Sequence, residues 1–397
     1  MELRILLDLR IGGPGQYSNR TKNPNTFYLP RAGELCRVVL TFGAKRIIGI
    51  APGPAFDAAE WKRISREIDE SIVVGPTKVG RAFCFSGNPV SGSWSGHRSG
   101  VQIHPPPGDA PRAPVLNADH PFILEFPLVA SGISQIQSYR WSREHGKLTR
   151  LLNVLLVRGT ASPRRRQRHF WACVHRDGDP FHVEWVGEFF FAKLGETVVE
   201  ALTPPAAEQV QELDPADYYG IEGLAGDSLR VPTDLDEMIS CHRALSKQNA
   251  EKFDRAAYWF DLASQQWHTS VSASFAALVS AAEALTQRGE IHRFECPVCH
   301  GPCQHELPGA TENFRAFFEA YAAGAGLKKR RSKMYSLRSG ILHGSDLMQI
   351  DQDRDFGWDP PTEDERELHD ELWSLTRTAL RNWLKNPPGS ACKTPRS

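Results

Sequence analysis

An arginine and a histidine lie five residues apart near the C-terminus, in the last part of a basic segment. Arg338 and His343 belong to residues 328–343, where apolar residues recur at helical spacing and Gly344 suits the C-cap. Arginine offers a fixed two-pronged donor to phosphate, and histidine titrates near neutral pH. On an ideal helix the two side chains point about 140° apart, so a second copy of the chain could complete the pair. The alternative is that both residues only cap and solvate the end of a bundle helix.

The residues around this pair resemble a known motif. Residues 337–344, which read LRSGILHG, resemble the LRxxIxHG signature of HEPN domains, particularly that of the Apea-like branch. Residues 274–285 are similar to the helix that precedes the motif in that family. The resemblance covers about residues 234–385 and implies an all-α helical bundle that dimerises so that two motifs face one groove.

This resemblance implies metal-independent cleavage of RNA without a catalytic cofactor. His343 would relay a proton to or from the ribose 2′-OH or the leaving 5′-oxygen, and Arg338 would stabilise the charge of the phosphorane. The products would carry 2′,3′-cyclic phosphate and 5′-OH ends. Such a ribonuclease would serve in a bacterial anti-phage or toxin system, with an unidentified trigger or neutralising partner. The alternatives are a non-catalytic HEPN protein that binds RNA or regulates as a dimer, and a domain used only for assembly.

Other residues of the same segment bear on RNA binding. Ser339 stands where the family motif commonly has Asn, Asp or His, so it would be a weak auxiliary polar group. Gly340 costs roughly 1 kcal/mol of helix propensity relative to Ala, which a close approach of two backbones at a dimer crossing would explain. The basic residues expected to contact RNA are Lys328, Lys329, Arg330, Arg331 and Lys333.

A second cluster has the composition of a metal site. The residues Cys296, Cys299, Cys303 and His305 form a C-x2-C-x3-C-x-H pattern. Thiolates and imidazole are the ligands that Zn²⁺ prefers, and His292 or His300 could replace His305. Such a closed structural zinc site would stabilise an insertion at 290–310 between two bundle helices. It would not be the catalytic centre. The alternative is a reduced loop without metal.

Composition and charge are those of an ordinary globular protein. The 397 residues have a formal net charge of zero, which argues against a protein that binds nucleic acid over its whole surface. No apolar stretch approaches the roughly 20 residues that span a membrane. The eight cysteines do not follow the spacing of a secreted disulfide framework. We therefore expect a cytoplasmic protein with no membrane partner.

The expected fold class is α+β and multidomain, with the boundary near residue 225. Residues 1–225 would form a β-rich domain of unknown role, for which the hypothesis is a sensor or targeting domain. Its expected elements are strands at 37–42, 47–50, 152–157 and 183–191, a helix starting at Asp57 as N-cap, and a long loop at 86–115.

Residues 226–397 would form the HEPN-like helical bundle with its Cys/His-rich insertion. Helical periodicity predicts helices at 234–266, 270–288, 311–323, 328–343 and 362–385. The acidic residues Asp351, Asp353, Asp355 and Asp359 lack the spacing of a calcium loop and are expected in a solvated loop.

Overall fold

The protein is described from a computed structural model. The structure describes residues 2–11, 26–29, 38–42, 47–54, 56–72, 75–108, 110, 118, 120–157, 159–161, 170–173, 183–186, 194–220, 228–286, 309–324, 328–352 and 360–389. Helices and strands are both well represented along the chain, so the fold is α+β, as the sequence predicts.

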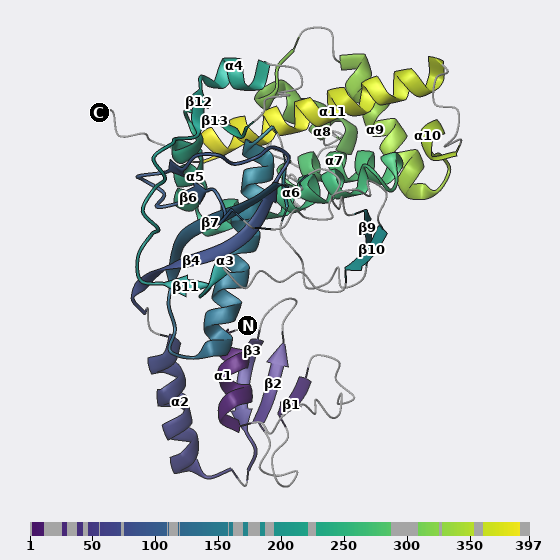
Figure 1. The fold of residues 1–397 in the computed structure, drawn as a ribbon. Helices are drawn as coiled ribbons and strands as arrows, with labels where there is room; N and C mark the ends of the chain where they lie inside the picture. The colour runs from purple at the N-terminus through teal and green to yellow at the C-terminus, as the bar shows by residue number, and fades with distance from the viewer. Residues whose placement is uncertain are drawn as a thin grey trace. The chain divides into compact units, whose positions relative to one another are not determined.

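The described elements are shown in Figure 1. The helices are α1 (Glu2–Ile11), α2 (Ala58–Ile72), α3 (Ser134–Leu155), α4 (Pro215–Gly220), α5 (Leu235–Ala244), α6 (Lys247–Gln266), α7 (Val271–Glu283), α8 (Ala310–Tyr321), α9 (Lys328–His343), α10 (Gln349–Gln352) and α11 (Pro360–Lys385). The strands are β1 (Thr26–Leu29), β2 (Val38–Phe42), β3 (Ile47–Pro52), β4 (Thr77–Ser86), β5 (Trp94–Ser95), β6 (Gln102–His104), β7 (His120–Val129), β8 (Thr160–Ala161), β9 (Phe170–Cys173), β10 (Val183–Val186), β11 (Val198–Val199), β12 (Gln211–Leu213) and β13 (Arg230–Pro232).

The chain divides into two compact units. Unit 1 comprises Met1–Gly80 and Pro127–Glu144, and unit 2 comprises Arg81–Phe126 and His145–Ser397. The expected boundary near residue 225 therefore does not separate these units. The parallel pairing of β12 with β13 joins segments on either side of residue 225, and so does the 2.6 Å hydrogen bond from Asn153 to Asp261.

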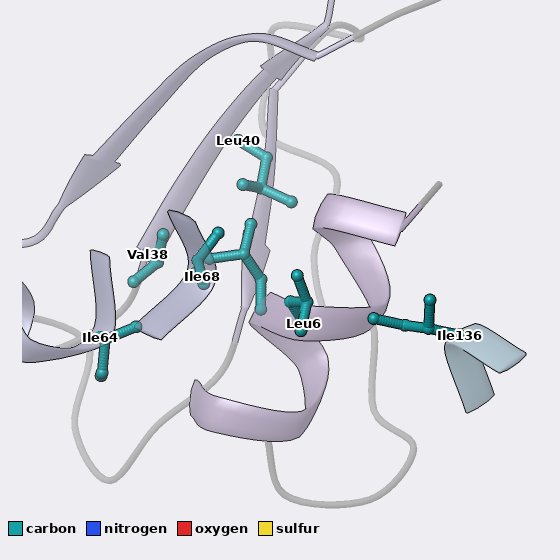
Figure 2. Packing of buried hydrophobic residues seen from close by; sticks show 7 residues of the cluster. Leu6, Val38, Leu40, Ile64, Ile68 and Ile136 are labelled. Carbon is teal, nitrogen blue, oxygen red and sulfur yellow. The ribbon is translucent and has the colours of Figure 1, made fainter. Parts of the chain in front are cut away.

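Unit 1 builds its core between helices and a small sheet. Strands β1, β2 and β3 form an antiparallel sheet in that order, which confirms the strands predicted at 37–42 and 47–50. The apolar core, drawn in Figure 2, consists of Leu6, Leu7, Val38, Leu40, Ile64, Ile68 and Ile136. Helix α2 begins where predicted, because the Asp57 carboxylate accepts the backbone N–H of Ala59 at 3.0 Å.

The segment expected to be a long loop at 86–115 contributes to the main sheet of unit 2. The strands of this sheet lie in the order β11-β4-β7-β6-β5, and β8 pairs with β4. Of these strands, β5 and β6 come from the segment 86–115. Trp94 and Ile103 are buried, and the Asp236 carboxylate accepts two backbone N–H groups of the turn between β5 and β6, each at 2.9 Å. The loop prediction is wrong at 94–95 and 102–104, which form β5 and β6, because the buried residues have no regular period and long-range contacts hold them in place; residues 109 and 111–117 of this segment lie outside the described residues.

The strand predicted at 152–157 is also wrong, because residues 152–155 form the last turn of α3. Buried leucines at 148, 151, 152 and 155 recur at the spacing of one helix face. A short apolar run does not by itself distinguish a buried strand from a buried helix, and the leucines upstream extend the helical pattern.

The helices after residue 228 follow the predicted order. The helix expected at 234–266 is interrupted at Leu245, and α6 restarts at the N-cap Ser246, whose side chain accepts the Asn249 N–H. Helix α7 is apolar nearly all round and contacts α6, α9 and α11, so it is the central helix of this part. Figure 1 shows α11, in yellow, running beside α7.

The acidic residues at 351–359 are not all in a solvated loop. The carboxylate of Asp351 accepts the N–H groups of Val271 (2.9 Å) and Ser272 (2.8 Å) and the Ser270 hydroxyl (2.7 Å). These hydrogen bonds satisfy the start of α7 and hold the pKa of Asp351 below its usual value, although burial acts in the opposite direction. The other three acidic residues lie outside the described ranges.

Candidate functional site

Helix α9 carries the arginine and histidine motif and packs against α7. Its bounds, Lys328–His343, are those predicted from the sequence. Met334 is buried, whereas Leu337 and Ile341 are half-buried. The predicted apolar stripe is therefore present but only partly covered within the described chain.

Arg338 is held by an acidic residue of α7. Its Nη2 donates to Glu283 Oε2 at 2.7 Å, and the hydroxyl of Tyr335 donates to Glu283 Oε1 at 3.1 Å. The guanidinium carbon also lies 5.7 Å from the centre of the Tyr335 ring. Burial and the nearby Glu283 charge raise the pKa of Tyr335, so its hydroxyl remains a donor at neutral pH. Glu283 thus fixes both side chains, which retain partial exposure to solvent.

His343 is the last residue of α9 and is exposed. The helix ends in a Schellman motif: the Ser345 N–H donates to the Gly340 carbonyl at 2.9 Å, and the Gly344 N–H donates to the Ile341 carbonyl at 3.2 Å. Gly344 adopts φ +71°, which confirms it as the residue that ends the helix. This turn leaves the imidazole at the surface.

The structure does not bring Arg338 and His343 together. Within the described part of the chain, no hydrogen bond joins the two side chains, as expected from their angular separation on one helix. Ser339, between them, is half-buried. A β-carbon on Gly340 would lie 2.7 Å from the Asp346 β-carbon. The turn of the same chain therefore accounts for this glycine, and a dimer crossing is not needed.

The basic residues of α9 differ in what they can contact. Arg331 is only 2% exposed and donates to the Ala322 carbonyl at 3.1 Å, so its burial argues against the predicted RNA contact. Arg330 is paired with Glu371. Lys333 is exposed, as predicted for a residue that contacts a ligand. The side chains of Lys328 and Lys329 are outside what the structure describes.

The predicted zinc ligands Cys296, Cys299, Cys303 and His305, and the alternatives His292 and His300, all lie outside the described residues. Among the residues that are described, no group of three or more Cys, His, Asp or Glu side chains could hold a metal ion. The zinc site therefore stays a prediction, which metal analysis of the purified protein would test.

Two further observations bear on the expected location of the protein. Cys241 is disulfide-bonded, to a partner whose side chain is not described, while Cys84 is a buried free thiol. Disulfides are rare in cytosolic proteins, so the disulfide of Cys241 does not favour the expected cytoplasmic location. That location stays a prediction. None of the helices in the described ranges combines the length and the apolar character needed to cross a membrane.

Sequence reasoning missed the residues that position Arg338. Glu283 is the one acidic residue of α7, which is otherwise apolar or small, and Tyr335 precedes Arg338 by three positions, the spacing of neighbours on a helix. The first of these features could have identified a half-buried partner for a cation. The chain matches no family model, and no curated protein or solved structure shows significant similarity to it.

Proposed function

We propose that the chain is a metal-independent endoribonuclease of the HEPN type. The observation that carries this proposal is the placement of Arg338, which Glu283 and Tyr335 orient on the helix that ends at the exposed His343. Arginine has five N–H donors in a fixed fork, and one of them is sufficient for the Glu283 contact. The remaining donors can stabilise a phosphorane, while His343 transfers the proton at the 2′-OH or the 5′-oxygen.

The geometry of the pair supports the proposal that the chain acts as a dimer. Arg338 and His343 do not touch within one chain, so one groove between two copies would combine Arg338 of one copy with His343 of the other. The expected products are RNA ends with 2′,3′-cyclic phosphate and 5′-OH. A bacterial defence or toxin role rests on the HEPN resemblance, with residues 1–225 as the sensor or targeting part.

Incubation of the full chain with cellular RNA after chelator treatment tests this function. We expect the wild type to cleave RNA with the stated ends and His343→Ala to lose cleavage by about 100-fold or more, the usual effect of removing a general acid–base. His268→Ala is the matched control, because this exposed histidine lies in the turn between α6 and α7. Equal cleavage by the wild type and His343→Ala would refute the assignment.

A non-catalytic HEPN protein that binds RNA or regulates as a dimer is the second candidate. It is favoured by the ion pair with Glu283, which already engages the guanidinium of Arg338. In this case RNA would remain intact with the wild type. Combined replacement of Lys328, Lys329 and Lys333 by Gln would abolish RNA binding, and His343→Ala would bind RNA as the wild type does.

A further inference from the structure

A cluster of positive charge on α11 has no place in the function proposed above. Arg377, Arg381 and Lys385 are spaced four residues apart, which places them on one face of the helix. The guanidinium carbon of Arg381 lies 3.1 Å from the centre of the Tyr219 ring, and Arg381 is 9% exposed. Arg381 therefore packs against α4, whereas the Lys385 side chain is 37% exposed.

Arg377 has no carboxylate partner among the described residues. It donates to the Val157 carbonyl at 3.4 Å, and its guanidinium carbon lies 5.5 Å from the ring centre of Phe260 and 5.8 Å from that of Trp373. Aromatic faces attract a cation but do not neutralise its charge. Its Nε is enclosed and makes no hydrogen bond to any described group.

The other two cations share one carboxylate. Asp234 Oδ2 lies 2.8 Å from Lys385 Nζ and 4.0 Å from Arg381 Nη2. Among the described residues, three positive charges thus face the one negative charge of Asp234, and two remain unbalanced. Burial lowers the pKa of Arg377 to about 10 and also lowers the pKa of Arg381, which shows that the enclosed charge is costly.

A buried hydroxyl adds a donor to this cluster. Tyr218 is 1% exposed, and its oxygen accepts the Val157 N–H at 3.0 Å. Burial raises the pKa of Tyr218 to about 12, so the hydroxyl keeps its proton. Arg377 and Tyr218 both contact the backbone of Val157, Arg377 at the carbonyl and Tyr218 at the N–H, so their polar groups lie in the same region. The hydroxyl proton has no acceptor in the described part of the chain, which leaves it able to donate to a ligand.

We propose that this cluster binds the oxyanion of a phosphate group, either inorganic phosphate or the phosphate of a small phosphomonoester. A guanidinium fork matches two oxygens of a phosphate, and the Tyr218 hydroxyl supplies a further donor. A doubly charged phosphate balances the two unmatched positive charges. Arg377 and Tyr219 are partly exposed, so the anion can enter from solvent.

Calorimetric titration of the full chain with inorganic phosphate, and separately with adenosine monophosphate, tests the proposal at constant ionic strength. We expect saturable binding by the wild type and weakening by about 10-fold or more in Arg377→Gln and in Arg381→Gln, the usual loss for one charged hydrogen bond. Tyr218→Phe should weaken binding by about 3-fold to 10-fold. Tighter binding of the monophosphate would identify a phosphomonoester as the ligand, and equal binding would identify free phosphate.

Arg366→Gln is the matched control, because it removes the same charge from the same helix outside the cluster. Arg377→Lys keeps the charge but loses the two-pronged guanidinium, so it should also bind phosphate more weakly than the wild type. This variant replaces Arg377→Gln in the test if Arg377→Gln does not fold. Circular dichroism checks the fold of each variant. Absence of saturable binding by the wild type, or equal weakening in Arg366→Gln, would overturn the proposal.

Discussion

Glu125 in the sheet of unit 2 is buried and Arg377 on α11 is half-buried, and among the described residues only Glu125 has a partner of opposite charge. Glu125 Oε1 accepts from Arg81 Nε at 2.8 Å and from the Thr203 hydroxyl at 2.6 Å, and its Oε2 accepts the Thr203 N–H at 2.8 Å. His104 Nε2 lies 3.6 Å away. Burial alone would raise the pKa of Glu125, yet these neighbours lower it to about 2.

Arg377, by contrast, has two aromatic rings and a carbonyl but no carboxylate partner among the described residues. Burial lowers its pKa to about 10. Glu125 is stabilised as an ion, so its role is structural. The lack of a described carboxylate beside Arg377 is the reason to expect an external anion there and not at Glu125.

Removal of the Glu125 charge should have the largest effect on stability. The isosteric change Glu125→Gln leaves Arg81 beside a neutral group, and breaking such a buried pair typically costs about 3–5 kcal/mol. Urea denaturation would measure the free energy of unfolding. Glu208→Gln, on an exposed residue, is the control and should change it by less than about 0.5 kcal/mol. Similar small effects of both changes would show that the Glu125 contacts contribute little.

Glu125 should also make stability depend on acid. Its pKa in the folded state is lowered, so its contribution is complete above the pKa of the unfolded chain and is lost as the pH falls from about 5 to about 2. The loss should be about 2–3 kcal/mol, from about 1.4 kcal/mol per unit of pKa. Urea denaturation at a series of pH values should show this loss in the wild type. In Glu125→Gln the same slope should be reduced, and an unchanged slope would assign the effect to other carboxylates.

The helices of the C-terminal part could be predicted well from sequence, whereas the partners of the charged residues could not. Helix α9 has the predicted bounds because its periodicity, its basic residues and Gly344 are all local signals. The strands β5 and β6 and the cap that Asp351 places on α7 depend on contacts between distant residues, whereas the break at Leu245 had a local signal in the N-cap Ser246. The helical end of α3 was missed because Leu152–Leu155 alone fits either a strand or a helix.

At the candidate site, too, the local features could be predicted from sequence and the contacts between distant residues could not. Arg338 and His343 were identified from their spacing and their resemblance to a motif, and their lack of mutual contact follows from helix geometry. Glu283 lies 55 positions from Arg338 in the chain, so no local pattern connects the two. The burial of Arg331 could not be predicted from sequence either. A run of basic residues predicts a solvent-exposed helix face unless the elements that pack against the helix are known.

Arg338 provides an intermediate case between Glu125 and Arg377, because it is paired but partly exposed. Arg338→Gln should lower the free energy of unfolding by only about 1 kcal/mol or less, as is typical of exposed ion pairs. RNA cleavage under the proposed function should fall by about 100-fold or more, since the phosphorane loses its charged donor. Measuring both quantities on one preparation separates a structural role from a catalytic one. A large loss of stability with little loss of cleavage would make Arg338 a structural residue.

The smallest effect is expected where the charge lacks a partner. Arg377→Met replaces an enclosed, unpaired guanidinium by an apolar side chain that can still pack between Phe260 and Trp373. Replacing enclosed charges by apolar residues is often neutral or stabilising, so the free energy of unfolding in phosphate-free buffer should change by less than about 1 kcal/mol. In saturating phosphate the wild type should gain stability through ligand binding and the variant should not. A destabilisation as large as that of Glu125→Gln would mean that the fold itself compensates the Arg377 charge, and the contrast between the two sites would disappear.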